Sequence, residues 1–219
     1  MRAEEAVVQA LARAGTVSDT VPATRSLYYR RLGVRQQELF ARAAVLAPDF
    51  YGTCAKGALI DGAADFADMQ PPVMRPEAIT RVEISDGGES EYEPGTRVRM
   101  VRLGEEHAAE KPRAVIRDRV FRSVGSDLDG VAEIMVYYPR SPEPIGPDGK
   151  DVELEIPAPF DELLVIDLAR YALSKTLDIE PETRVAAIQA LSEEEAALLA
   201  QFDAHVRNYA PLEARFGGG

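Results

Sequence analysis

Residues 131–175 read VAEIMVYYPRSPEPIGPDGKDVELEIPAPFDELLVIDLARYALSK, and this stretch contains in order each kind of element that the chain is predicted to use. Its first eight residues are rich in β-branched and aromatic side chains. They alternate, with Ala132, Ile134, Val136 and Tyr138 on one side. Alternation of this kind predicts a β-strand with one face on an apolar core.

A loop, a short strand and a helix complete the stretch. Four prolines follow Tyr138 at short intervals and predict a stiff, extended loop over 139–149. Apolar residues alternate again over 152–156, which predicts a short strand. Apolar residues at helical spacing then predict an amphipathic helix over 159–177. Its stripe consists of Phe160, Leu163, Leu164, Leu168, Tyr171 and Ala172.

Helices are also predicted at both ends of the chain. Apolar periodicity predicts helices over 4–14 and 24–47, the second ended by Pro48. A further helix begins at Pro181, and Ser192 with Glu195 has the spacing of a capping box that restarts or reinforces it. Small residues, glycines and a Pro-Pro pair over 50–74 predict a loop with at most one helical turn.

A β region lies between the two sets of helices. Strands are predicted over 78–84, 96–103, 114–124 and 131–138, separated by turn residues. Four or five short strands at this spacing favour an antiparallel sheet. The expected fold class is α+β, a helical bundle with an inserted antiparallel β subdomain. The expected parts are 1–75 (N-terminal helices), 76–140 (β insert), 141–158 (loop and short strand), 159–210 (C-terminal helices) and 211–219 (tail).

Length and composition set limits on the class of protein. A chain of 219 residues is long enough for a substantial core. Its single cysteine, Cys54, excludes an internal disulfide, fits a reducing compartment and is expected to be a small core residue. No apolar run is long enough to cross a membrane and no signal-peptide core follows the first residues, so we expect a protein that is neither anchored nor exported.

Charge is distributed in alternating blocks. The formal net charge of −12 argues against a general nucleic-acid binder, whose affinity depends on cations. Basic and acidic residues number seven and four in 1–42 (+3), three and ten in 43–96 (−7), eight and four in 97–122 (+4), and six and sixteen in 141–219 (−10). Such blocks either pair basic and acidic faces of neighbouring subunits or form separately solvated surfaces.

The usual residues of catalysis and metal binding are scarce. There are only two histidines, His107 and His205, and both are expected to be solvated. The motifs of zinc proteases, nucleophile-elbow hydrolases and phosphate-binding loops are absent. Asp127 and Asp129 lack the remaining ligands of a calcium loop and predict a turn. The acidic run 193–195 is expected to be a solvated helix start rather than a metal site.

An arginine stripe on the β region is the main candidate interaction site. Arg97 with Arg99, and Arg117 with Arg119, fall on alternate positions, so each pair is expected on one face of a strand. This stripe is either a soluble sheet face that blunts edge pairing, an interface with neighbouring subunits or partners, or a DNA contact. The three interpretations remain open on sequence alone.

Several of these segments together resemble the head–tail connector adaptors of tailed bacteriophages. The resemblance lies in the run IMVYYP (134–139), a proline-rich loop, VELEIP (152–157), and a helix opening PFDELL (159–164) and continuing to RYAL (170–173). The upstream order is also similar, with a helical pair ending in a Pro-Asp-Phe-Tyr step (48–51) and an inserted β region. The similarity covers most of the chain as an order of elements.

The resemblance implies a structural virion protein of the neck. Such adaptors form a ring, commonly of about twelve copies, beneath the portal protein; the ring joins the DNA-filled head to tail or stopper proteins. Genomic DNA passes through the channel without specific binding. The resemblance places portal docking on the tail residues Leu212, Arg215 and Phe216. It implies no enzymatic activity, no catalytic residues, no metal, no cofactor and no membrane, with assembly in the host cytoplasm.

Two alternatives stay open. One is another component of the virion, such as a tail-completion or stopper protein. The other is a small cytosolic enzyme or ligand-binding module that uses carboxylates without histidine. An enzyme is expected to have a deep pocket with converging polar groups inside one copy, whereas a ring subunit is expected to expose patches that only other copies cover.

Overall fold

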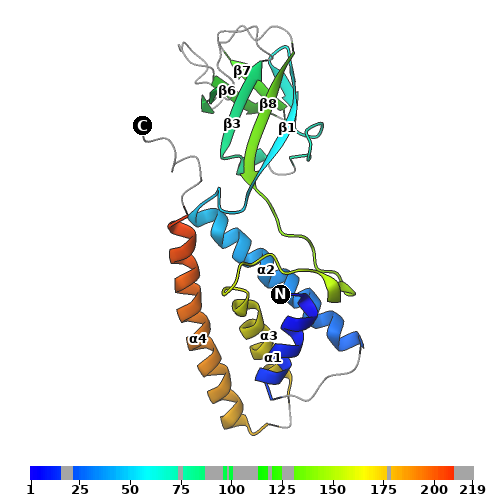
Figure 1. Cartoon of the computed structure of the whole chain (residues 1–219), viewed down its shortest axis with the longest axis vertical. Helices are drawn as coiled ribbons and strands as arrows, with labels where there is room; N and C mark the ends of the chain where they lie inside the picture. Colours follow the sequence, from blue (N-terminus) through cyan, green and yellow to red (C-terminus); the bar gives the residue numbers. More distant parts are fainter. Residues whose placement is uncertain are drawn as a thin grey trace. The chain divides into compact units, whose positions relative to one another are not determined.

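The computed structural model describes nine segments, which are residues 1–15, 22–73, 76–86, 96–97, 99–100, 113–117, 120–124, 131–176 and 179–209. The chain divides into two compact units (Figure 1). We call Met1–Ala47 with Ser141–Gly219 the helical unit and Pro48–Arg140 the β unit. The fold is therefore α+β, with helices at both ends of the chain and an inserted β unit, as predicted.

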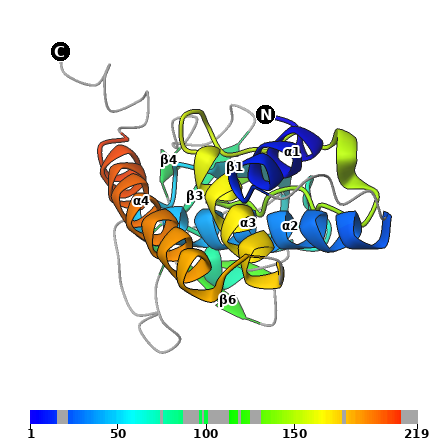
Figure 2. The same cartoon turned by 90° about the horizontal axis from the view of Figure 1, so that it is seen from below.

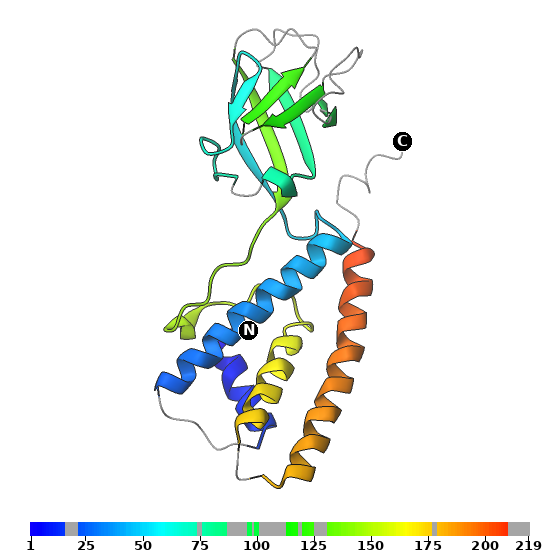
Figure 3. The same ribbon diagram turned by 180° about the vertical axis from the view of Figure 1, so that it is seen from behind.

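Among the residues that the structure describes, the helical unit contains four α-helices, close to where the sequence predicts them. They are α1 (Ala3–Arg13), α2 (Pro22–Leu46), α3 (Glu162–Lys175) and α4 (Pro181–Arg207). The third helix contacts the other three and is buried at seven consecutive residues, 163–169. Figure 2 shows α3 between α1 and α4, and Figure 3 shows α2 crossing it on the other side. Because α3 is apolar on nearly all sides, it forms the centre of the bundle.

The predicted restart of the last helix at Ser192 is wrong. One uninterrupted helix, α4, contains this residue, and the Ser192 hydroxyl donates a hydrogen bond to the backbone oxygen of Ile188 at 2.7 Å. A serine inside a helix commonly bonds the carbonyl four residues earlier, so the capping-box spacing is coincidental here.

The predicted short strand over 152–156 is also wrong. A 3₁₀ turn, η2 (Gly149–Asp151), precedes this segment, and the segment itself forms one isolated bridge, between Arg2 and Glu153. The amide of Leu154 donates to the oxygen of Met1 at 2.9 Å. The bridge and this hydrogen bond pair the backbone of Glu153 and Leu154 with the start of α1. They do not extend into a ladder of several residues.

The β unit is one eight-stranded sheet. Its strands are β1 (Gly52–Ile60), β2 (Ala63–Asp65), β3 (Arg81–Asp86), β4 (Thr96–Arg97), β5 (Arg99–Met100), β6 (Arg113–Arg117), β7 (Val120–Val124) and β8 (Val131–Pro139). Their order in the sheet is β4-β3-β8-β1-β2-β7-β6-β5. All pairs are antiparallel except β5 with β6.

The two edge strands of this sheet are neighbours in the chain. Only residue 98 separates β4 from β5, so the α-carbons at the two edges lie within about 8 Å of each other. The sheet must therefore curl until its edges approach, which encloses an apolar interior.

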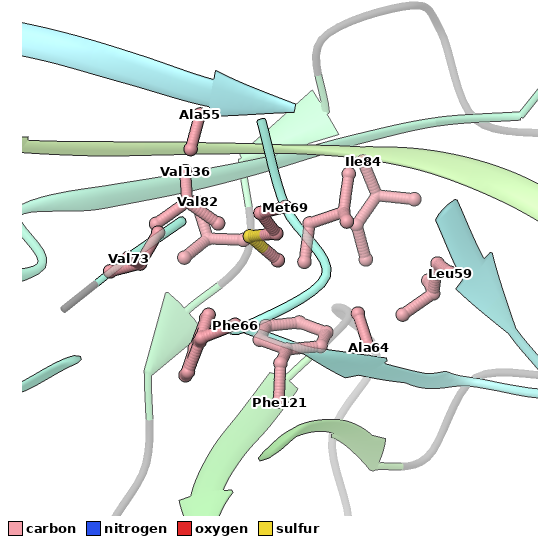
Figure 4. Packing of buried hydrophobic residues seen from close by; sticks show 11 residues of the cluster. Ala55, Leu59, Ala64, Phe66, Met69, Val73, Val82, Ile84, Phe121 and Val136 are labelled. Carbon is pink, nitrogen blue, oxygen red and sulfur yellow. The ribbon is translucent and has the colours of Figure 1, made fainter. Parts of the chain in front are cut away.

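Residues 50–74, predicted as loop, instead supply the central strand β1 and part of the core. All nine residues of β1 pair with β8. Small residues in β1 hide the strand pattern, but they are required by packing: a Cβ on Gly57 would lie 2.9 Å from the Cγ of Met69. Met69, Phe66 and Phe121 are fully buried, and Figure 4 shows the surrounding side chains pointing toward one another. The β unit therefore begins at Pro48, and the predicted boundary at 75/76 is wrong.

The predicted strand over 114–124 is a hairpin. β6 and β7 pair antiparallel, with Arg117 opposite Val120. No glycine or asparagine marks the reversal at this point of the sequence, which explains why one strand was expected. Phe121 of β7 then contributes the largest side chain on this side of the core.

Candidate functional site

Arginine–carboxylate ion pairs connect the helices of the helical unit. Arg31 of α2 donates its Nε and Nη2 to the two carboxylate oxygens of Asp167 on α3, each at 2.7 Å. The Asp167 side chain is only 6% exposed, whereas that of Arg31 is 43% exposed. A bidentate geometry of this kind satisfies a buried carboxylate and fixes the orientation of two helices.

A second bidentate pair joins α2 to α4. Arg42 donates to both oxygens of Asp203, each at 2.6 Å. This hydrogen bonding lowers the pKa of Asp203 below its usual value, against the opposing effect of burial. The carboxylate is therefore held in its charged form by α2.

Glu195 of α4 binds arginines from two other helices. Its carboxylate accepts from Arg35 of α2 at 2.5 Å and from Arg170 of α3. The run 193–195 is thus in the middle of α4 and not a solvated helix start, and its third member is largely buried between helices. That prediction was wrong because the partners of Glu195 are distant in sequence.

Glu4 similarly connects α1 to α2. Its carboxylate accepts from the guanidinium of Arg25 and from the hydroxyl of Tyr29. Burial, and then the hydrogen bond to Glu4, raise the pKa of Tyr29 to about 12. The tyrosine therefore remains a neutral donor across the range in which most proteins work.

The charge blocks of the sequence are therefore used in part within a single chain. Basic residues of the first block pair with acidic residues of the last, through Arg31, Arg35 and Arg42. The two predicted outcomes were contacts between subunits and separately solvated surfaces. Intramolecular pairing is a third outcome, and it shows that these three arginines hold the bundle together.

An open hollow lies beside α4. It has a volume of about 420 Å³ and is lined by Pro159, Asp161, Glu162, Glu194, Ala197, Leu198 and Gln201. Arg13 of α1 pairs with Glu162 at 2.7 Å and with Glu194 at 3.2 Å. Burial raises the pKa of Glu162; Arg13 opposes this rise and the Glu194 carboxylate adds to it. We call this feature the acidic hollow.

The lining of the acidic hollow combines apolar residues with carboxylates. It contains three carboxylates and no histidine, cysteine, serine or lysine. Among the described residues, no group of three or more potential metal-ligating side chains comes together. A lining of this composition suits a cationic and partly aliphatic group.

The described residues cover the predicted arginine stripe only in part. Arg97 ends β4 and Arg99 begins β5, and these two strands pair with different neighbours. Arg117 is the last residue of β6, and Arg119 lies outside the described residues. The stripe as a whole therefore stays a prediction.

The tail residues Leu212, Arg215 and Phe216 lie outside the described residues, as do His107, Asp127 and Asp129. His205 is exposed, as predicted, and its ring lies 5.2 Å from that of Phe160. In the part of the chain that the structure describes, no helix is long and apolar enough to cross a membrane.

The outer face of β8 carries a small polar cluster. The Tyr137 hydroxyl donates to Glu83 at 2.9 Å, and the guanidinium of Arg81 lies 3.8 Å from the centre of the Tyr137 ring. Cys54 is opposite Tyr137 in the sheet, and burial raises the pKa of its thiol. The raised pKa favours the protonated thiol, and the hydrogen bond from Tyr137 to Glu83 joins β8 to β3.

Sequence reasoning missed the side chains that connect the helices. The weak signal for them was the opposite charge of the first and last blocks, which indicated attraction but not its partners. Comparison of the chain with protein-family models and with curated proteins found no match.

Proposed function

We propose that this chain is a structural subunit of a phage neck, a head–tail connector adaptor that forms a ring beneath the portal. The observation that carries the proposal is a set of exposed aliphatic side chains on the helical unit. Leu27, Val34 and Val45 on α2, Val8 on α1 and Val185 on α4 are all exposed in a single copy. Three of them share one side of α2, and exposed apolar side chains that share one side of a helix are typical of surfaces that another protein covers.

The order of elements also supports this proposal. The strand β8 leads into an extended segment, and α3 follows with its Leu163-Leu164 step buried at the centre of the bundle. This is the order on which the resemblance to connector adaptors rests. The inserted β unit occupies the position of the β region in the same resemblance.

The ion pairs between the helices suit a structural protein whose helices must not separate. A buried carboxylate that loses its arginine is strongly destabilising, so bidentate pairs resist separation of the helices. Three such carboxylates connect α2, α3 and α4, namely Asp167, Glu195 and Asp203. A rigid bundle can transmit force between a head and a tail without deforming.

The proposed ring joins the head to the tail and leaves a central channel for the genome. The strongly acidic chain repels phosphate, so DNA is expected to pass without sticking. In this proposal the protein has no catalytic residue and needs no cofactor.

Negative-stain electron microscopy of the purified full-length protein tests this function. We expect rings with a central channel, either alone or after addition to DNA-filled heads that carry a portal but lack a neck. Rings that bind isolated tails rather than heads would instead favour the stopper or tail-completion alternative. Protein that remains monomeric and binds neither particle would contradict the proposal.

A further inference from the structure

Three exposed aliphatic side chains form an interrupted stripe along one side of α2. Val34 and Val45 follow Leu27 by seven and eighteen positions, which places all three within about 20° of one another on an α-helix. They are 47%, 45% and 84% exposed. The stripe extends for about 27 Å, at 1.5 Å per residue, and Glu38 interrupts it between Val34 and Val45.

A free cation lies beside this stripe. Arg30 is exposed and precedes Val34 by one helical turn, so the two side chains are neighbours on the surface of α2. Unlike Arg31 and Arg35, Arg30 has no ion-pair partner among the described residues. We call Arg30 and Val34 the α2 knob.

The acidic hollow has the complementary composition. Leu198, Ala197 and Pro159 provide apolar contact, and the side chains of Asp161, Glu162 and Glu194 provide three carboxylates. One arginine, Arg13, is shared by two of them, and the amino group of Met1 lies 4.0 Å from Asp161, so two cations face three carboxylates. Another cation with an aliphatic neighbour fits this lining in both charge and polarity.

The α2 helix of the same copy does not occupy the acidic hollow. α4 contacts α2 through Glu195 and Asp203, whereas the acidic hollow is lined by Glu194, Leu198 and Gln201. On a helix of 3.6 residues per turn these two sets lie on different sides. Each copy therefore presents a knob and a hollow at separate places.

We propose that the α2 knob of one copy seats in the acidic hollow of α4 in the next copy. Val34 then contacts Ala197 and Leu198, and Arg30 adds a third cation to the three carboxylates. This inference rests on the proposed ring function and identifies the surfaces that build the ring. A contact between two different surfaces is head-to-tail, and repetition of a head-to-tail contact closes into a ring when the rotation allows it.

A symmetric contact between two α2 helices is the competing arrangement for the same stripe. In the parallel orientation it would place Arg30 of one copy near Arg30 of the other, and like charges across an interface are unfavourable. In either orientation the carboxylates of the acidic hollow would gain no further cation. Charge complementarity therefore favours the second copy in the head-to-tail orientation.

Disulfide trapping tests the contact. Val34→Cys and Ala197→Cys are introduced separately into full-length protein carrying Cys54→Ser, mixed in equal amounts and oxidised. A disulfide requires α-carbons about 4.4–6.8 Å apart, so only a direct contact between these positions is captured. We expect a crosslinked dimer in the mixture, none with either variant alone, and a ladder of higher oligomers from the double variant. Val8→Cys mixed with Ala197→Cys is the matched control, because Val8 is an equally exposed valine on α1.

A dimer formed by Val34→Cys alone would overturn the proposal in favour of the symmetric contact. Oligomers detected by light scattering without any crosslink in the mixture would also overturn it, while leaving the ring function intact. A chain that is monomeric at all concentrations, with no crosslink, would count against both this contact and the proposed ring function.

Assembly of a charged variant provides a second readout. Val34→Glu adds a carboxylate to the knob opposite carboxylates of the acidic hollow, so we expect the midpoint concentration of assembly to rise about tenfold or more. Val8→Glu is expected to leave it unchanged. Equal effects of the two substitutions would contradict the assignment.

Discussion

Different kinds of interaction stabilise the interior of each of the two units. Helices of the helical unit are joined by an apolar core together with arginine–carboxylate pairs between residues far apart in sequence, such as Arg31 with Asp167. Strands of the β unit are joined by a continuous ladder, such as the nine-residue pairing of β1 with β8, around a cluster of buried apolar side chains. Specific charged contacts orient the helices, whereas backbone hydrogen bonds and the packing of buried apolar side chains orient the strands.

This difference predicts that the units unfold separately. Phe121 and Phe202 are each fully buried, one in the core of each unit. Phe121→Ala and Phe202→Ala are each expected to lower the free energy of unfolding of their own unit by about 3–5 kcal/mol. Amide hydrogen exchange resolved by residue measures the two effects, with loss of protection confined to one unit in each variant. Equal loss of protection in both units would show that they unfold together and would remove the basis of the comparison.

Removal of one partner of the ion pair between Arg31 and Asp167 should lower the free energy of unfolding by a smaller amount. The loss should differ between the two partners. Arg31→Met leaves a buried carboxylate without its partner, and we expect a cost of about 1–3 kcal/mol, less than for a fully buried pair because the arginine is partly exposed. Asp167→Asn leaves the half-exposed Arg31 able to reach water and should cost less. Urea denaturation followed by far-UV circular dichroism measures both. A larger cost for Asp167→Asn would contradict the structure of this contact.

Acid should reduce the stability of the helical unit through Asp203. The pKa of this carboxyl is lowered in the folded protein by hydrogen bonds from Arg42, so folding favours its charged form. The resulting stability is complete above the ordinary pKa of 3.8 and is lost as the pH falls through the lower folded value. Asp203→Asn should therefore remove part of the acid dependence of the unfolding midpoint. Glu182→Gln on the exposed side of α4 is the control and should retain it; equal slopes in the two variants would contradict the prediction.

The helices and the strands β3 and β8 could be predicted because their patterns are local. Val82 and Ile84 of β3, and Ile134 and Val136 of β8, alternate in sequence and are buried as expected. β1 could not be predicted, since Gly57 is small in order to admit Met69, and small residues look like a loop. The charge blocks were expected either to join neighbouring subunits or to be solvated separately, whereas Asp167 and Glu195 find partners in the same chain more than a hundred residues away, which no local pattern contains.

Two breaks between strands were missed for a related reason. Period-two spacing places two side chains on one face only when both belong to the same strand. Arg97 belongs to β4 and Arg99 to β5, and β6 ends at Arg117, opposite the first residue of β7, Val120. No glycine or asparagine stands between these strands in the sequence, so neither break was expected. The acidic hollow was also missed, because Pro159, Glu162 and Glu194 come together only after α3 packs on α4.

The central claim is that the helical unit builds the assembly and that the β unit is an inserted module. The β unit enters and leaves at adjacent points, since Gly52 pairs with Pro139 and the Arg140 amide donates to the Tyr51 oxygen at 3.0 Å. A short glycine–serine linker in place of 48–140 should therefore leave the helical unit folded. We would measure the mass of the full chain and of this shortened chain by light scattering across a concentration series. The account predicts oligomers with the same number of copies from both chains. A shortened chain that keeps its helices but remains monomeric, while the full chain assembles, would contradict it.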